Sequence, residues 1–238
     1  MEFGAVATLD NVLFRGNRAG DGSSTSGDLS GGECGGLLND GDATLTDVTF
    51  SVNRAEDGRA AAQGPGGFGG AGGGLENSGT VTLSRVSFIS NRAGNGGGSR
   101  GDGPGDGGGG GGLENDGVAN LTDCTFIHNR AGRVGAGIAG GYGGSGGAIE
   151  DQDTSVTLTR VTIDHNRAGE SFWGIAGDGG GLFSISTATL TNVTVTRNRA
   201  GSGPRYAGGS GGGLWLSDAT LTNVTIALNH AGKGKPGN

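Results

Sequence analysis

The chain has 238 residues, 59 of them glycine, and a formal net charge of −7. This acidic balance argues against a nucleic-acid-binding protein, because such proteins present a basic face to the phosphates. No apolar stretch approaches the roughly 18 residues of a membrane span, and Met1–Gly4 lacks the basic and apolar regions of a secretory signal.

A phrase that begins with leucine and ends with asparagine recurs seven times. Successive asparagines lie 36, 38, 38, 37, 32 and 31 residues apart. Six copies continue with Arg-Ala and the last with His-Ala. Such self-similarity predicts stacked units, each of which buries its apolar side against its neighbours. The copies are Leu9–Asn17, Leu45–Asn53, Leu83–Asn91, Leu121–Asn129, Leu158–Asn166, Leu190–Asn198 and Leu221–Asn229.

Taken in chain order, each unit predicts three short strands. The first carries an apolar residue after a run of small residues, as at Leu37, and the second contains the leucine of the phrase, as at Leu45. Apolar alternation then slips at Asp47 and again before Asn53, and a slip indicates a corner because a strand alternates its faces strictly. No helical stripe of apolar residues appears. The sequence therefore predicts an all-β protein.

The predicted architecture is a single right-handed parallel β-helix of about seven coils, one domain over residues 1–238 with no evident cap at either end. Its asparagines are expected to point inward as a ladder, in which each side-chain amide binds the next. Such a ladder satisfies polar groups that would otherwise cost about 1–3 kcal/mol each when buried. The ladder residues are Asn17, Asn53, Asn91, Asn129, Asn166, Asn198 and Asn229.

Variable glycine-rich segments separate the third strand of one unit from the first strand of the next. Residues 95–112, 133–147 and 170–181 are examples. Because they carry few bulky apolar residues, we expect them to project as loops from one corner of the rod. Glycine permits either floppy linkers or extended segments that stack on one another, and composition does not decide between the two.

Two motifs in these units resemble a known family. Gly-Gly-Ala-Ile at 146–149, with the variants at 72–75 and 179–182, resembles one half of a paired signature, and Phe-x-x-Asn, as at Phe50–Asn53, resembles the other. The pair is similar to the polymorphic outer membrane protein repeats of chlamydial surface proteins and related bacterial proteins. The resemblance implies a right-handed parallel β-helix that is extracellular or on the bacterial cell surface and acts in adhesion or surface structure.

Threonines flank the inward leucine of most copies. Since both flanking positions point outward, they predict a flat array with about 7 Å along a strand and about 4.8 Å between strands. The array is similar to the ice-binding face of β-solenoid antifreeze proteins, although threonine is also a good strand former on any solvent face. Asp10, Ser84 and Asn120 interrupt it. Its threonines are Thr44, Thr46, Thr82, Thr122, Thr157, Thr159, Thr189, Thr191, Thr220 and Thr222.

The arginines after the asparagines form a second candidate surface. A column of like charges needs acids or bound anions close by, so it either grips an anionic ligand such as an acidic polysaccharide or pairs with Asp21, Glu56, Asp57 and Glu170. The net acidity of the chain favours pairing. The column is Arg18, Arg54, Arg92, Arg130, Arg167 and Arg199.

Nothing in the sequence points to catalysis. Glu76, Glu114 and Glu150 form one regular column, whereas an active site usually breaks repetition. His128 and His165 have no evident nucleophile or metal partner, and Cys34 and Cys124 are poor candidates for a disulfide. We therefore expect no enzyme activity, no metal and no cofactor. A polysaccharide-binding or polysaccharide-cleaving β-helix is the alternative that other proteins of this fold suggest.

The ends suggest self-association. Met1 lies at the interval from Leu9 that separates Leu113 from Leu121, and joining Asn238 to a second Met1 gives an asparagine step of 26 residues. Open ends that differ from one another favour head-to-tail filaments, unless the chain is part of a longer surface protein. The sequence thus predicts a non-catalytic extracellular structural or adhesive protein, whose partners are other copies or a host or matrix surface. Ice binding and polysaccharide binding remain alternatives.

Overall fold

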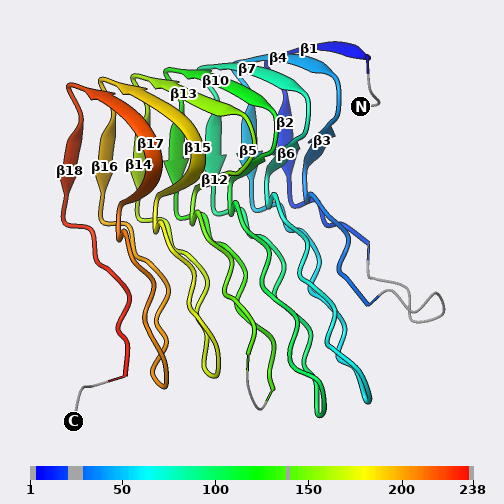
Figure 1. Cartoon of the computed structure of the whole chain (residues 1–238). Coiled ribbons are helices and arrows are strands. Elements are labelled where there is room, and N and C mark those ends of the chain that lie inside the picture. The colour runs from blue at the N-terminus through cyan, green and yellow to red at the C-terminus, as the bar shows by residue number, and fades with distance from the viewer. Residues whose placement is uncertain (1–3, 21–28, 138–139, 236–238) are drawn as a thin grey trace.

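The computed structural model describes residues 4–20, 29–137 and 140–235. Every regular element in these residues is a β-strand, 18 in all. The strands wind into a parallel β-solenoid of about six turns (Figure 1). The predicted fold class is confirmed, but the predicted number of about seven coils is too high. Seven asparagines enclose only six intervals, and each interval is one turn.

Three strands make up most turns, as predicted. The first strands are β3 (Leu37–Asn39), β6 (Leu75–Asn77), β9 (Leu113–Asn115) and β12 (Ile149–Asp151). The second strands are β1 (Val6–Asp10), β4 (Asp42–Thr46), β7 (Thr80–Ser84), β10 (Val118–Thr122) and β13 (Ser155–Thr159). The third strands are β2 (Leu13–Arg15), β5 (Thr49–Ser51), β8 (Ser87–Ile89), β11 (Thr125–Ile127), β14 (Thr162–Asp164), β16 (Thr194–Thr196) and β18 (Thr225–Ala227).

In the last two turns the first and second strands join into β15 (Leu182–Thr191) and β17 (Leu214–Thr222). A glycine-containing turn separates the two strands in three earlier coils, at Gly41, Gly79 and Gly117. After Ser184 the chain continues through Ile185 and Ser186 as one strand, with a register shift between Ser184 and Thr187. This junction links the first and second strands into one 11-stranded sheet, beside a 7-stranded sheet of third strands.

Both corners of each coil contain a residue in the left-handed conformation, which explains the slips in the sequence pattern. Asp47 (φ 54°) marks the first corner and Val52 (φ 57°) the second, and their equivalents in later coils have similar angles. Asparagine, aspartate and glycine tolerate this conformation. Val52 and Leu228 (φ 58°) do not, so the stacking of coils imposes strain there.

Identical apolar residues stack in register to form the core. Leu45 pairs with Leu9 on one side and Leu83 on the other, and it is fully buried. Four phenylalanines, Phe14, Phe50, Phe88 and Phe126, form a face-to-face column with ring centroids 4.5–4.9 Å apart. Burial in this fold therefore comes from the coil above and the coil below.

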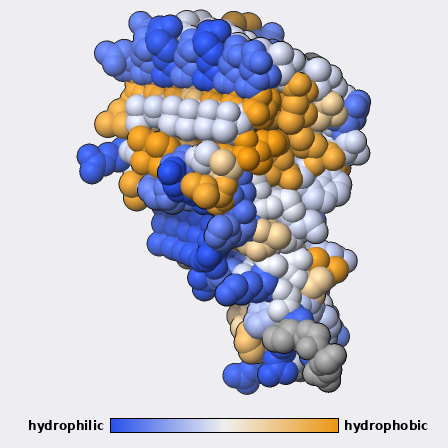
Figure 2. Space-filling view, turned by 90° about the vertical axis from the view of Figure 1, so that its left-hand side faces the viewer, coloured by the Kyte–Doolittle hydropathy of each residue, from blue (hydrophilic) through white to orange (hydrophobic). Residues whose placement is uncertain are grey.

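The last described coil differs from the inner ones because no described coil covers it. Leu221 and Ile226 are exposed there, whereas their counterparts in the preceding coil, Leu190 and Val195, are buried. Figure 2 looks at this end of the molecule and shows hydrophobic surface between bands of hydrophilic surface.

The glycine-rich loops are extended and stacked, which decides the question that composition left open. Each loop runs out from the rod and returns, and the paired segments lie side by side along the molecule (Figure 1). Backbone amides link them in a continuous series: Gly70 donates to Glu56 O (2.9 Å), Gly94 to Gly70 O (2.8 Å), Gly108 to Gly94 O (2.9 Å) and Gly132 to Gly108 O (2.8 Å). We call this two-layered arrangement the loop slab.

Glycine is required inside the slab because the backbones touch. A Cβ on Gly94 would lie 1.8 Å from Glu56 O, and one on Gly108 would lie 2.1 Å from Gly70 O. Inward glycines recur at every third position, as at Gly67, Gly70 and Gly73. Three residues per turn is the period of the extended polyproline II conformation. Residues three apart on one loop segment therefore share a face of the slab.

Candidate functional site

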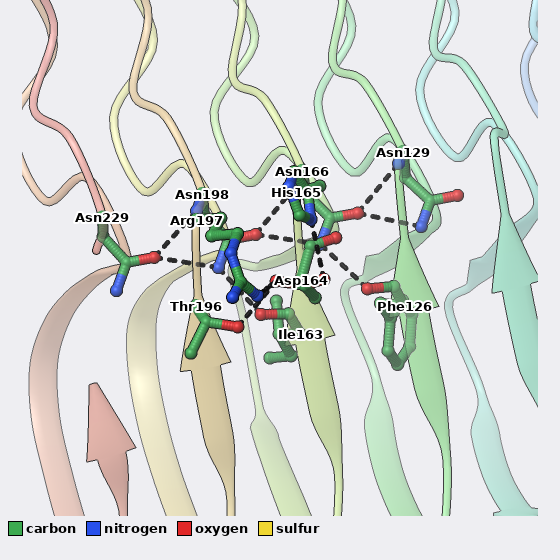
Figure 3. Close-up of polar contacts among 10 residues, drawn as sticks. All are labelled: Phe126, Asn129, Ile163, Asp164, His165, Asn166, Thr196, Arg197, Asn198 and Asn229. Atoms are coloured by element: carbon green, nitrogen blue, oxygen red, sulfur yellow. Dashed lines mark hydrogen bonds and ion pairs between the residues drawn. The ribbon is translucent and has the colours of Figure 1, made fainter. Parts of the chain in front are cut away.

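The predicted asparagine ladder is confirmed and holds the second corner of every coil (Figure 3). In each step Nδ2 of one asparagine donates to Oδ1 of the next, from Asn17 to Asn53 (2.9 Å) through to Asn198 to Asn229 (3.1 Å). The same Oδ1 accepts the backbone N–H of the preceding asparagine. The second Nδ2 hydrogen of Asn91 reaches the carbonyl of Phe50 (2.9 Å). The ladder is therefore a structural element of the solenoid.

A second ladder at the end of the first strands was missed by the sequence analysis. Asn39 donates to Asn77 (2.6 Å), Asn77 to Asn115 (2.7 Å) and Asn115 to Asp151 (2.7 Å), and Ser184 donates to Asp151 (2.7 Å). All five side chains are fully buried. Each of these residues stands two positions after the first apolar residue of its strand. The residue type changes from asparagine to aspartate and serine along the chain, so the column is not visible as a repeat in the sequence.

The six predicted arginines stack as one column, and successive backbones pair in parallel from Arg18 to His230. Most of them bind the acids named from sequence: Arg18 pairs with Glu56, Arg54 with Asp57, and Arg130 and Arg167 with Glu170. Asp21 lies outside the described residues. Arg92 and Arg199 have no ion-pair partner in the part of the chain that the structure describes. The column is thus neutralised along much, but not all, of its length.

Burial and neighbouring positive charges lower the pKa of the inner arginines of the column. Burial, with repulsion from Arg133, Arg167 and Arg92, lowers the pKa of Arg130 to about 10. Burial also lowers the pKa of Arg92 and of Arg167. An anion beside the column would offset this repulsion, because opposite charge favours the ionised form.

A basic groove of about 500 Å³ opens beside the C-terminal end of this column. We define it by His165, Arg167, Arg197, Arg199, Leu228 and His230, which line it together with two ladder asparagines. Asp164 binds two of the lining residues: it accepts hydrogen bonds from Arg197 (3.4 Å) and from Thr196 (2.6 Å), and it contacts Nδ1 of His165 (2.7 Å) (Figure 3). Burial opposes ionisation of Asp164, but these bonds hold its pKa below the usual value. Three arginines therefore line the groove, of which Arg167 pairs with Glu170 and Arg197 with Asp164.

A larger groove of about 790 Å³ lies farther along the same loop segments. We call it the aromatic groove and define it by Arg133, Glu170, Phe172, Trp173, Pro204 and Lys233, all of which line it. The ring of Phe172 meets that of Trp173 edge to face, with centroids 5.3 Å apart. The guanidinium of Arg205 lies 3.8 Å from the Trp173 centroid. This groove was not predicted from the sequence, although Phe172 and Trp173 stand out as bulky rings inside a glycine-rich segment.

The predicted glutamate column is buried under the slab, on the side of the returning loop segments. Glu76, Glu114 and Glu150 pair in register on β6, β9 and β12. A Cβ on Gly109 would lie 1.2 Å from Oε2 of Glu150, so the loop backbone covers this carboxyl closely. Burial and neighbouring acids raise the pKa of Glu76 to about 7.

Burial and repulsion from Asp116 raise the pKa of Glu150 to about 7. Burial and repulsion from Glu150 raise the pKa of Glu114 well above its usual value, and Gln152 donates a hydrogen bond to Glu114 (2.9 Å). All three carboxylate side chains are buried, so they do not face the solvent as the acid and base pair of polysaccharide cleavage does.

The threonine columns are in register as predicted. Thr44 pairs with Thr82, Thr157 with Thr189 and Thr189 with Thr220. Asn120 stands between Thr82 and Thr157 and breaks the column. The threonines are exposed or half-buried, so the array faces outward.

The histidines and cysteines are the remaining candidate residues. The rings of His128 and His165 lie 5.1 Å apart. Among the described residues, no group of three or more His, Cys, Asp or Glu side chains is arranged to hold a metal ion. Cys34 and Cys124 are unbonded, and burial raises the pKa of their thiols to about 12 and about 11.

Comparison of the chain with protein-family models, curated proteins and solved structures gives no match. The fold and the two grooves therefore carry the functional argument. Within the described ranges, no helix has the length and apolarity that a membrane crossing requires.

Proposed function

We propose that this chain is a non-catalytic adhesive protein of the polymorphic outer membrane protein repeat type, which acts outside the cell and attaches to a carboxylated polysaccharide through the basic groove. The Gly-Gly-Ala-Ile and Phe-x-x-Asn motifs support the repeat type. The observation that carries the binding proposal is Arg199, which is exposed and has no ion-pair partner among the described residues.

Charge distribution along the arginine column supports this location. Glu56, Asp57 and Glu170 bind arginines of the earlier coils. Around Arg199 the groove is also lined by His230 and by Arg167 and Arg197, which pair with Glu170 and Asp164. Guanidinium groups form planar forks that match carboxylates. An acidic polymer would therefore find its strongest attraction here, even on a protein with a net charge of −7.

Retention on immobilised polygalacturonate tests the proposal. Arg199→Gln is expected to weaken binding by about tenfold, which is the effect of one charge-assisted hydrogen-bonded contact. Arg100→Gln is the matched control, because Arg100 is an exposed arginine at a loop tip of another coil. Absence of retention at low salt, or equal elution of the two variants, would refute binding through this groove.

Ice binding is a second candidate, favoured by the in-register threonine columns. Thermal hysteresis of the purified protein measures it, and Thr157→Lys should abolish the effect because a long charged side chain disrupts the array. A protein that leaves ice growth unaltered is not an ice-binding protein. Head-to-tail stacking stays a prediction, which light scattering at high protein concentration would test.

A further inference from the structure

The repeat is broken in one region of the slab. Most loop residues are glycine, alanine, serine or aspartate, but neighbouring loops carry the exposed bulky residues Tyr142, Phe172, Ile175 and Tyr206. Of the aromatic rings in these loops, Phe172 and the half-buried Trp173 line the aromatic groove. A scaffold that needs only glycine to stack has no structural use for exposed rings. Exposed rings in a groove are typical of binding sites.

The two grooves lie on the same face of the slab. Arg130 and Arg133 are three residues apart, as are Arg167 and Glu170, and His230 and Lys233. Extended segments with three residues per turn place such pairs on one face, about 9 Å apart along the segment. Each pair has one member at the arginine column and the other in the aromatic groove. One polymer can therefore cross both grooves.

The charges of the aromatic groove suit an acidic sugar. Glu170 lies between Arg130 (3.4 Å), Arg133 (3.1 Å) and Arg167, so positive charge exceeds negative charge around it. Arg133 is half exposed and Lys233 is exposed, so both can reach a carboxylate in the groove. The oxygens of Glu170 and the hydroxyl group of Ser202 offer partners for sugar hydroxyls.

We propose that the aromatic groove is a subsite for the same polysaccharide, where the apolar face of a hexuronate ring packs on the face of Trp173 opposite Arg205 while Arg133 and Lys233 bind its carboxylate. This inference rests on the proposed function and names its substrate class, a hexuronate polymer. A single-stranded nucleic acid also stacks on aromatic rings, but it needs a track of rings and a basic surface without carboxylates. Glu170 in the groove and the net charge of −7 disfavour it.

Tryptophan fluorescence tests the subsite directly. The chain has two tryptophans, and Trp215 stacks on Phe183 (4.7 Å) away from the groove, so Trp215→Phe leaves Trp173 as the sole reporter. In this background, oligogalacturonate should shift the emission of Trp173, whereas a neutral malto-oligosaccharide should not. Trp173→Ala in the natural background should weaken polygalacturonate binding by about tenfold.

The outcomes separate the two proposals. If polygalacturonate binds but the emission of Trp173 is unchanged and Trp173→Ala binds normally, the subsite is refuted while the basic groove stands. If polygalacturonate does not bind at all, both proposals fail. Tighter binding of dextran sulfate than of polygalacturonate would overturn the assignment to carboxylates, and tighter binding of a thymidine oligonucleotide would overturn the assignment to polysaccharide. Circular dichroism of each variant confirms that the β-solenoid is intact.

Discussion

Replacement of Glu76 by glutamine should change how the stability of this protein depends on pH. Burial under the slab, with repulsion from Glu33, Asp116 and Asp40, raises the pKa of Glu76 from 4.5 to about 7. The folded state therefore holds this proton more tightly than the unfolded chain. The contribution of protonated Glu76 to the unfolding free energy is fully present below about pH 4.5 and is lost as pH rises through about 7.

The interval between these two pKa values corresponds to about 3 kcal/mol of unfolding free energy. Glutamine stays neutral, so Glu76→Gln should be more stable than the natural protein at pH 8 by up to about 3 kcal/mol, or roughly 6–12 °C in the melting temperature of a domain of this size. At pH 4 the difference should largely disappear, because Glu76 is then protonated in both the folded and the unfolded state.

Thermal unfolding followed by circular dichroism at pH 4, 6 and 8 measures this effect. The matched control is Asp102→Asn, which removes a negative charge from an exposed loop position and should leave the pH profile unchanged. A shift in melting temperature that is the same at pH 4 and pH 8 for Glu76→Gln would show that burial does not hold Glu76 neutral, and the reasoning would fail.

Three further changes test the scaffold. Asn91→Ala removes a ladder amide and leaves buried partners on both neighbouring coils unsatisfied, so chemical denaturation should show a loss of about 3–5 kcal/mol. Gly94→Ala places a Cβ 1.8 Å from a backbone oxygen and should increase loop proteolysis, whereas Gly101→Ala, where space is open, should not. Val52→Asn relieves a left-handed valine and should raise stability by about 1 kcal/mol in the same denaturation assay, and a loss would contradict the assigned strain.

Much of the fold could be predicted from the sequence because one physical rule governs it. A slip in alternation at Asp47 marks a corner, and the structure has a left-handed residue at that position. The inward asparagines were predictable because their identity never changes. The second ladder was not, since Asn115 gives way to Asp151 and Ser184 while the hydrogen bonds persist. A column of changing residue types leaves no repeat in the sequence.

The candidate site was harder to predict because its parts come from different loops. Glycine content is compatible with both mobile and stacked loops, so the sequence does not place Trp173 beside Arg133. The burial of Glu150 likewise depends on Gly109, 41 residues earlier in the chain, whose backbone lies against the carboxyl. The arginine column was predicted, and its pairing with Glu56, Asp57 and Glu170 is confirmed.

The loop slab explains how a net acidic protein can present a basic binding face. It is two segments thick: outgoing segments begin at the arginine column, and returning segments cover the glutamate column. Because burial raises the pKa of Glu76 and Glu150 to about 7 and that of Glu114 well above its usual value, these carboxyls carry less negative charge near neutral pH than exposed glutamates do. An anionic ligand at the arginines is therefore repelled only weakly by these glutamates. Deprotonation of the glutamates at high pH should strengthen this repulsion and weaken binding of the ligand.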